Sequence, residues 1–211
     1  MTEFQPRGRS DTIRVDLLVI SDLIESGARV LDIGCGDGAL LHYLAHNKDV
    51  DGRGIEISQA GVNACVRQGL SVVQGDADTD LRDYPDKAFD YVVLSQTLQA
   101  THSPREVLAE LVRIGRHAIV SFPNFAYWRI RWQLLASGRM PETEALAAPW
   151  YETPNIHFCT IRDFVILCRD MGLRIEQRSF LTHEGKTGRF RSTGLWANFL
   201  GEQGLFVLRG P

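Results

Sequence analysis

The segment that decides the fold is Val30-Leu31-Asp32-Ile33-Gly34-Cys35-Gly36-Asp37-Gly38, because an apolar strand ends there in a glycine-rich turn. The turn opens a helix that the pattern predicts from Gly38 to His46. Glycines permit a tight turn and leave no side chains between the backbone amides and a ligand, while the helix start supplies unpaired N–H donors. The segment therefore predicts a nucleotide-binding edge. Gly34, Gly36 and Ala39 also fit the loose dinucleotide pattern G-x-G-x-x-G/A, so the turn alone does not exclude NAD.

Two more strands are predicted to end near acids. Residues 52–57 form the second strand, with Glu56 near its end, 22 positions after Gly34. A carboxylate at that place can accept from both ribose hydroxyls, in NAD-binding proteins as well as in others, so Glu56 indicates an adenosine ligand without identifying it. Residues 70–78 form a third strand that ends in an acidic turn. In this loop we expect Asp78 and Asp80 to be solvated acids rather than ligands.

Asp32 inside the strand and Gly38 after the turn extend the pattern to D-x-G-x-G-x-G, which resembles the first motif of class I methyltransferases that use S-adenosylmethionine (SAM). The methionine end of SAM is a zwitterion beside a sulfonium. A site with acids close to the glycine turn therefore suits SAM better than it suits a diphosphate. The resemblance implies that Asp76 accepts from the adenine amino group. We expect Cys35 to be a small residue that fits the turn, since no basic neighbour in sequence would lower its pKa. The expected binding set for SAM or S-adenosylhomocysteine (SAH) is Asp32, Gly34, Cys35, Gly36, Gly38, Glu56, Ile57, Asp76, Ala77 and Ser95.

Length and composition predict one domain over residues 1–211. The net charge of −3 gives no sign of a nucleic-acid or membrane surface, and no apolar run approaches the length of a membrane span. The four cysteines show no C-x-x-C spacing, which is simplest to interpret as reduced thiols in a cytoplasmic protein.

Helices and strands are expected to alternate, which predicts an α/β fold with a doubly wound, mostly parallel Rossmann-like sheet. Ser103 is expected to cap a helix that has Pro104 at its first position and Glu106 three residues after the cap. The other expected elements are a helix at 12–25, strands at 90–95 and 117–122, a helix at 160–171 and strands at 173–180 and 204–208.

A helical insertion over about 124–158 follows the fifth strand and does not belong to this alternation. It places Trp128 and Trp132 one helical turn apart, with Arg129 and Arg131 beside them. Trp and Arg often anchor interfaces, but a helix that covers the sheet with its aromatic side chains in the core is an equal alternative. The position favours function, because ligands of open α/β sheets lie outside the carboxyl ends of the strands.

The amino-acid sequence in and beside this insertion resembles the MetW family of methionine biosynthesis proteins. The strings that carry the resemblance are Val120-Ser-Phe-Pro-Asn-Phe125, Trp128-Arg-Ile-Arg131, Gly138-Arg-Met-Pro141, Thr153-Pro-Asn-Ile-His157 and Cys159-Thr-Ile-Arg-Asp-Phe164. The resemblance implies a class I methyltransferase fold, an antiparallel last strand, and a protein that works with the homoserine O-acyltransferase MetX. It implies no methyl acceptor.

The acceptor side of the expected site, residues 95–102, offers neutral polar groups and no recognised acceptor motif. His157 is the best candidate for a base, although a structural role is the better expectation for it. His42 and His46 lie one helical turn apart without a third ligand, so we expect no metal site.

Two functions remain open. The chain is either a SAM- or SAH-binding subunit that docks on MetX through the insertion or the 186–191 loop, which we favour, or a methyltransferase acting on a small metabolite. A NAD-dependent oxidoreductase is a distant third.

Overall fold

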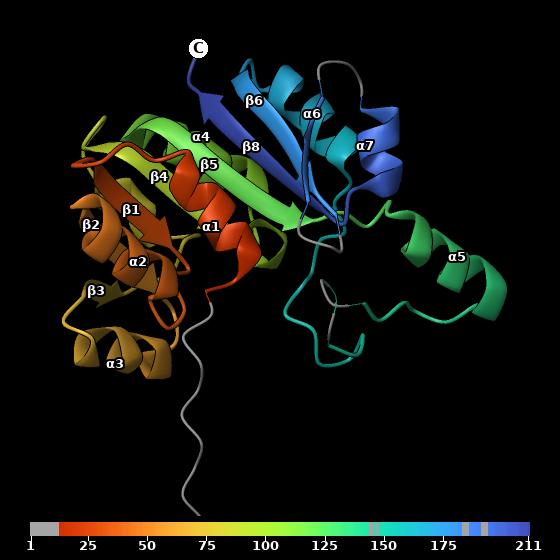
Figure 1. The fold of residues 1–211 in the computed structure, drawn as a ribbon, viewed down its shortest axis with the longest axis horizontal. Helices are drawn as coiled ribbons and strands as arrows, with labels where there is room; N and C mark the ends of the chain where they lie inside the picture. The colour runs from red at the N-terminus through yellow and green to blue at the C-terminus, as the bar shows by residue number, and fades with distance from the viewer. Residues whose placement is uncertain (1–12, 144–145, 147, 183–185, 191–193) are drawn as a thin grey trace, which may run out of the picture.

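A computed structural model describes residues 13–143, 146, 148–182, 186–190 and 194–211. Helices and strands alternate along most of the chain, and a single sheet runs through the molecule (Figure 1). With η for short 3-10 helices, the elements are α1 (Val15–Asp22), β1 (Arg29–Ile33), α2 (Ala39–Lys48), β2 (Asp51–Glu56), α3 (Gln59–Arg67), β3 (Ser71–Gln74), η1 (Asp80–Asp83), β4 (Phe89–Ser95), η2 (Leu98–Ala100), α4 (Pro104–Ile114), β5 (Gly115–Pro123), α5 (Trp128–Ser137), α6 (Ile161–Asp170), β6 (Arg174–Leu181), β7 (Thr187–Arg189), α7 (Leu195–Leu200) and β8 (Gln203–Arg209).

The sheet has the strand order β3-β2-β1-β4-β5-β8-β6-β7. Strands β1 to β5 pair in parallel, and β8 is antiparallel to both of its neighbours, β5 and β6. The expected antiparallel last strand is therefore confirmed. A short strand that the sequence did not predict, β7, pairs antiparallel with β6. The chain moves outward from β1 in one direction and from β4 in the other, so the topological switch point lies between β1 and β4.

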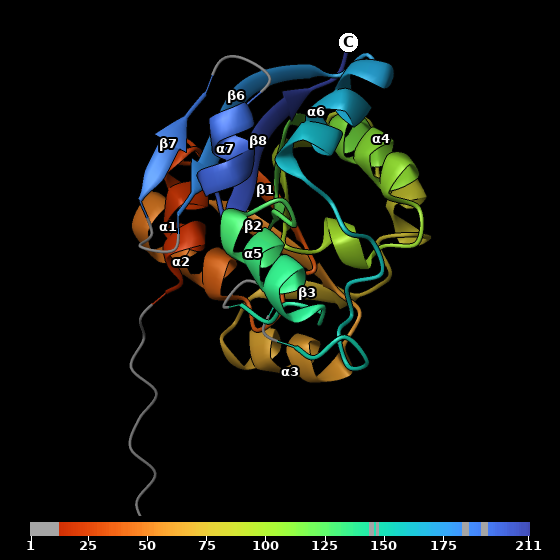
Figure 2. The ribbon, with the colours of Figure 1, turned by 90° about the vertical axis from the view of Figure 1, so that its right-hand side faces the viewer.

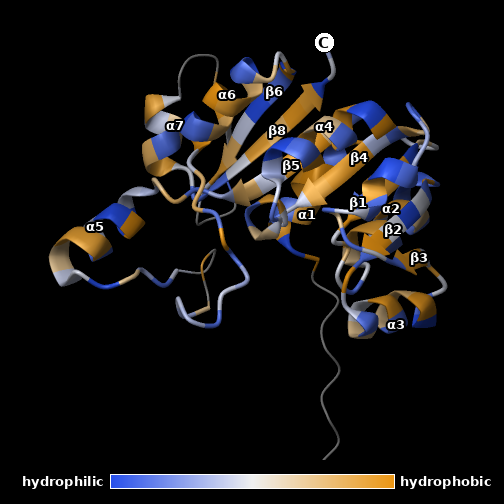
Figure 3. Cartoon of the chain, turned by 180° about the vertical axis from the view of Figure 1, so that it is seen from behind, coloured by the Kyte–Doolittle hydropathy of each residue, from blue (hydrophilic) through white to orange (hydrophobic). Residues whose placement is uncertain are grey.

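Helices cover both faces of the sheet (Figures 1 and 2). On one face, α1 and α2 pack on alternate residues of β1, β4 and β5, and on the other face α4 and α6 pack on the residues between them. The strands at the centre of the sheet are strongly hydrophobic in Figure 3, as expected for strands buried on both faces. The expected first helix is present as α1, and Leu17 and Ile20 in it and Ile24 just after it are buried in the core.

The register of the parallel strands brings their carboxyl ends to one edge. Ile33 at the end of β1 is opposite Ile55 on one side and Leu94 on the other. The residues that leave β1, β2, β3 and β4 therefore emerge side by side, and we call this line of strand ends the carboxyl edge.

The start of α4 differs from the expected cap. The Ser103 side chain makes no capping hydrogen bond. The carboxylate of Asp78 instead accepts from the backbone N–H groups of His102 and Ser103 at 2.8 and 2.9 Å. Glu106 forms an ion pair with Arg82 rather than closing a capping box. Asp78 is thus a structural cap and not a solvated loop acid, because the chain from β3 brings its carboxylate to unpaired helix donors.

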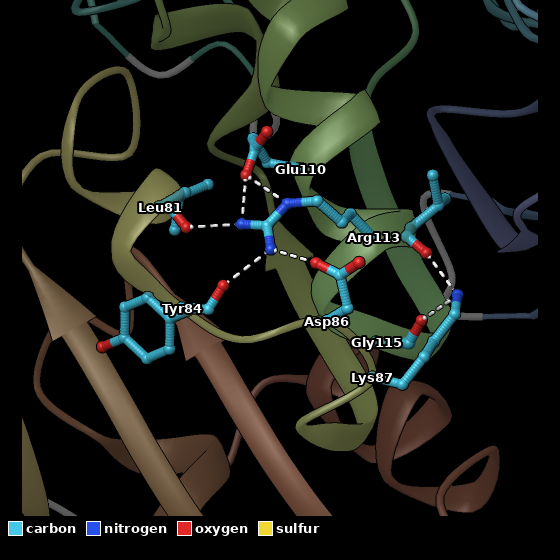
Figure 4. Close-up of polar contacts among 8 residues, drawn as sticks. Leu81, Tyr84, Asp86, Lys87, Glu110, Arg113 and Gly115 are labelled. Carbon is cyan, nitrogen blue, oxygen red and sulfur yellow. Dashed lines mark hydrogen bonds and ion pairs between the residues drawn. The ribbon is translucent and has the colours of Figure 1, made fainter.

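The other end of α4 is fixed by two cations (Figure 4). Arg113 pairs with Glu110 and Asp86 and donates to the carbonyls of Leu81 and Tyr84. Lys87 donates to the carbonyls of Val112 and Gly115, which lie at the helix end. These bonds hold the connection between β3 and β4 against α4, and this connection carries the acidic turn of the carboxyl edge.

Candidate functional site

The glycine turn after β1 has the left-handed backbone that glycine favours. The φ angles of Gly34, Gly36 and Gly38 are +70°, +59° and +83°. A Cβ on Gly34 would lie 2.6 Å from the Thr97 hydroxyl, so the turn after β4 packs directly against the turn after β1. A Cβ on Gly36 would meet nothing within 4 Å. Gly36 therefore faces open space, where a ligand can approach the backbone.

Glu56 ties β2 to this turn. One of its carboxylate oxygens accepts from the N–H of Gly36 and the other from the N–H of Ser58, both at 2.8 Å. The side chain is buried, yet each carboxylate oxygen has a second lone pair for a further donor such as a ribose hydroxyl. The next residue, Ile57, is 65% exposed and offers an apolar surface beside that carboxylate.

The acidic turn after β3 holds its own shape. Asp76 accepts from the N–H of Asp78 through Oδ1, and its own N–H donates to the carboxylate of Asp80. Asp80 is exposed but bonded, so it also shapes the turn. Ala77 is half-buried against the main core. Asp76 lies one residue beyond Gly75, whose N–H continues the pairing with β2 by donating to the carbonyl of Glu56.

Charges of both signs surround the glycine turn. Burial raises the pKa of Asp32 to about 7, and the nearby negative charge of Glu56 adds to the effect. Arg14, just before α1, forms a two-point pair with buried Asp16 at 2.6 and 3.0 Å. Hydrogen bonding to Asp16 raises the pKa of Arg14, and the charges of Asp16, Asp37 and Asp32 act in the same direction. A guanidinium close to two carboxylates at a glycine turn matches a ligand end that carries both charges.

The sequence pattern does not mark Arg14 and Asp16 as site residues, because an Arg and an Asp at the start of an amphipathic helix look like ordinary surface residues. Only the tertiary structure brings them to the carboxyl edge. An aligned family that kept both residues would have been the signal.

The turn after β4 continues this network toward the insertion. Gln96, which has a φ of +52°, donates through Nε2 to Asp16 at 2.9 Å. Gln99 donates to the carbonyl of Gln96, and its own carbonyl accepts from the N–H groups of Ile156 and His157. Hydrogen bonds therefore run without interruption from Arg14 to the end of the insertion.

Two polar groups of the acceptor side, residues 95–102, are placed by the structure. The Ser95 hydroxyl at the end of β4 lies 3.2 Å from that of Ser121 in β5. The Oε1 atom of Gln99 is buried and finds no donor among the described residues. The His157 side chain is exposed, and only its backbone is held at the edge. A catalytic role for His157 stays a prediction.

The cysteines and the histidine pair behave as structural groups. The Cys35 side chain turns inward, 4.0 Å from the sulfur of Cys65, and burial raises the pKa of its thiol, so only its backbone faces the edge. His46 bonds through Nδ1 to the carbonyl of His42. Within the described ranges, no three His, Cys, Asp or Glu residues are grouped closely enough to hold a metal ion.

The insertion leaves the body through a closed neck. Phe125 donates through its N–H to the carbonyl of Cys159, and the rings of Phe125 and Phe158 stack at 4.5 Å. The fully buried Asn124 donates to the carbonyls of Asn198 and Gly201 and accepts from the N–H groups of Ala126 and Ile161.

Beyond this neck, α5 projects away from the sheet (Figure 1), and its tryptophans are exposed. The alternative that Trp128 and Trp132 belong to the core is wrong.

Comparison with known proteins agrees with this geometry. The family model "Methionine biosynthesis protein MetW" matches residues 14–208. The chain belongs to the MetW family. A bifunctional methionine biosynthesis protein MetXA/MetW from Rhodopirellula baltica is 37% identical to it over 189 residues, which are 85% of this chain and 30% of that protein. A fatty-acid O-methyltransferase from Mycolicibacterium smegmatis is 43% identical over 98 residues, covering 43% of this chain and 34% of the relative. The chain thus spans about a third of the length of these two relatives.

Several solved structures with the same fold are SAM-dependent methyltransferases. One from Mesorhizobium loti has a TM-score of 0.67 at 15% identity and covers 93% of this chain and 98% of its own. The [4+2]-cyclase SpnF has a TM-score of 0.62 at 18% identity, covering 93% and 80%. At this level of identity the likeness shows the class I methyltransferase fold, and SpnF shows that the fold carries other chemistry. In the part of the chain that the structure describes, no helix is long and apolar enough to cross a membrane.

Proposed function

We propose that this MetW family member binds SAM or SAH at the carboxyl edge and acts as a partner or regulatory subunit of the homoserine O-acyltransferase MetX. The observation that carries the ligand is the joint presence of Glu56 on the glycine turn and of Arg14 beside Asp32 and Asp37. A dinucleotide would bring its diphosphate toward these carboxylates, whereas the methionine end of SAM carries both charges. The NAD alternative is therefore disfavoured.

We assign the residues to the parts of the ligand in their order along the edge. Glu56 would accept from the ribose hydroxyls with its remaining lone pairs, and Ile57 would pack on the adenine. Asp76 uses Oδ1 for the hydrogen bond from the N–H of Asp78, and its other carboxylate oxygen would accept from the adenine amino group. Gly34, Gly36 and Gly38, with the backbone of Cys35, would lie against the methionine portion. Asp32, Ala77 and Ser95 complete the expected set. When bound, SAM would supply an activated methyl group.

The partnership with MetX is supported by the bifunctional MetXA/MetW relative. In the Rhodopirellula baltica protein the region similar to this chain is 30% of a polypeptide whose name also contains MetXA. Domains joined in one protein often have counterparts that associate as separate chains. SAM is made from methionine, so a SAM-binding partner would connect the level of the end product to the acylation step.

Methyl transfer to a small metabolite is the second candidate. It is favoured by the local similarity to a fatty-acid O-methyltransferase and by the buried, unpartnered Oε1 of Gln99 on the acceptor side. A hydrogen-bond donor on a methyl acceptor bound beside Gln99 would satisfy that atom. His157 would then be the candidate base.

Calorimetry with SAM, SAH and NAD tests the ligand. We expect SAM or SAH to bind and NAD not to bind, and binding of NAD alone would overturn the assignment.

Co-purification with the MetX of the same organism, followed by an acyltransferase assay with and without SAM, tests the partnership. Production of SAH from homoserine or its O-acyl esters by the purified chain alone would favour the methyltransferase instead.

A further inference from the structure

Helix α5 lacks the packing that normally stabilises a helix of its length. It has ten residues, all of them described, and only Ile130 is buried. An isolated helix shorter than about 12–15 residues is marginal in water, because most helical stability in proteins comes from a packed apolar face. The neck fixes where α5 begins, but none of the residues that the structure describes covers its outer surface. Such a helix is completed by something that binds it.

The uncovered surface of α5 is apolar in a helical stripe. Trp128, Trp132 and Leu135 follow one another at intervals of four and three residues, and they are 40%, 63% and 80% exposed. Beside the stripe lies a groove of about 580 Å³. Its walls are formed by Trp128, Arg129, Trp132 and Gln133 on one side and by Glu142, Thr143 and Glu202 on the other. A groove lined by two indoles is a socket for apolar side chains of a partner.

Helix α7 extends this surface across a different part of the chain. Trp196 is 76% exposed, and Leu195, Phe199 and Leu200 are exposed beside it. The Arg131 guanidinium lies 5.8 Å from the centre of the Phe199 ring, which joins α5 to α7. Figure 2 shows the two helices facing the same side. We call Trp128, Trp132, Leu135, Trp196 and Phe199 the aromatic surface.

The α5 side of this surface is basic, unlike the whole chain, whereas the opposite wall of the groove carries Glu142 and Glu202. Residues 125–140 contain Arg129, Arg131 and Arg139 and no Asp or Glu, although the chain has a net charge of −3. A partner that fits would carry acidic groups around apolar contacts, because unpaired charges at a closed interface are unfavourable. The surface is also held in a fixed direction, since Asn124 donates two hydrogen bonds to Asn198 and Gly201 at the end of α7 and accepts one from Ala126 in the insertion and one from Ile161 at the start of α6. A fixed surface loses little freedom when it binds.

We propose that the aromatic surface is where the homoserine O-acyltransferase docks, with the two tryptophans of α5 as anchors and its arginines facing acidic groups on the enzyme. This inference rests on the proposed function, and the fused relative is the reason for committing to that partner rather than to a second copy of this chain or to a lipid surface. It also selects the insertion over the 186–191 loop. Part of that loop, residue 191, lies outside the described residues.

The test compares variants of the full chain that remove contacts without disturbing the core. Trp132→Ala and Leu135→Asp change exposed side chains of α5, and Arg129→Glu reverses a charge at the groove. Val66→Asp and Arg105→Glu are matched controls, because both residues are exposed on α3 and α4, away from the aromatic surface. Each variant is measured for melting temperature, for SAH affinity, and for affinity to the purified MetX of the same organism.

We expect Trp132→Ala and Leu135→Asp to weaken the acyltransferase complex by about thirtyfold or more, which is the size of an anchor residue's contribution. Melting temperature and SAH affinity should stay at the wild-type values, and both controls should bind the enzyme normally. Variants of α5 that remain folded and bind the enzyme as tightly as wild type would overturn the docking surface while leaving the partnership intact. A wild-type chain that fails to bind the enzyme would overturn the partnership itself, and the docking surface with it.

Two further measurements address the other occupants. A concentration-dependent dimer of wild type that Leu135→Asp abolishes, seen by ultracentrifugation without the enzyme, would assign the surface to a second copy. Binding to phosphatidylglycerol vesicles that Trp132→Ala abolishes would assign it to a lipid surface. Either result overturns the proposal, whereas a monomer that ignores the vesicles and loses the enzyme only in the α5 variants supports it.

Discussion

The carboxyl edge and helix α5 use their residues in opposite ways. At the edge, side chains that look polar and exposed in the sequence are buried or bonded, as for Glu56 with its two backbone N–H donors. In α5, side chains that look like core residues are exposed, as for Trp132. On the proposals above, a small ligand would complete the edge, whereas a macromolecular partner would cover α5. A set of substitutions can test each side of this comparison.

The largest effect is expected for Gly34→Ala. The new Cβ would strain a backbone with φ of +70° and collide with Thr97, at a combined cost of about 2–4 kcal/mol in the free energy of unfolding. Ligand binding at the edge should be lost as the turn shifts. Denaturant unfolding and SAH calorimetry measure the two effects.

Gly27→Ala is the matched control for that substitution. Its φ is +75°, but a Cβ there would meet nothing within 4 Å, so only the backbone penalty of about 1–2 kcal/mol applies and SAH binding should remain. Equal effects of the two variants would mean that the contact between the turns after β1 and β4 is unimportant.

Glu56→Gln should weaken SAM and SAH binding by about 1.5–3 kcal/mol, the range for a hydrogen bond to a charged group. An amide oxygen can replace one acceptor, but the amide NH₂ would oppose the N–H of Gly36 or Ser58. Titration calorimetry gives the affinity. Gln59→Glu, at an exposed position of α3, controls for a change of charge nearby. An unchanged affinity would remove Glu56 from the binding site.

Asp32 should make stability depend on pH. Its pKa is raised from 3.8 to about 7 in the folded chain, so the unfolded state releases the proton first as the pH rises. Stability contributed by the protonated carboxyl is complete below about pH 4 and is lost between pH 4 and 7. Asp32→Asn should therefore gain stability relative to wild type across that window, which unfolding curves at pH 4.5 and 8 would measure. An equal difference at both pH values would contradict the shift.

Bound SAM should reverse part of this effect. A cationic ligand end near Asp32 favours the ionised carboxylate, so SAM affinity should rise by up to about tenfold between pH 6 and 8. The comparison with Asp32→Asn removes the titration of the ligand itself, because that contribution is common to both proteins. The same pH profile for both would place the cation elsewhere.

The smallest effect is expected for the stability of Trp132→Ala. Because the indole is 63% exposed, the free energy of unfolding should change by less than about 0.5 kcal/mol. Ile130→Ala, two residues away and buried, should cost about 2–5 kcal/mol. Thermal unfolding distinguishes them, and a large loss for Trp132→Ala would show that α5 packs on the body after all.

The local pattern of the sequence determined the alternating elements, the glycine turn and the acids that follow the strands. The mostly parallel sheet follows from strands separated by helices, and the left-handed turn follows from Gly34, Gly36 and Gly38, because only glycine adopts that backbone without strain. These features depend on neighbours in the chain, so the chain reveals them. The strings of the insertion also identified the family.

Only the tertiary structure decided which polar groups meet. Asp78 rather than Ser103 caps α4, and Arg14 and Gln96 join at Asp16, because these partners are distant in sequence and are brought together by the order of the strands. The exposure of Trp128 and Trp132 belongs to the same class. A helix with aromatic residues on one side has the same sequence whether that side faces the core or a partner. The direction in which the neck of the insertion holds α5 decides between the two.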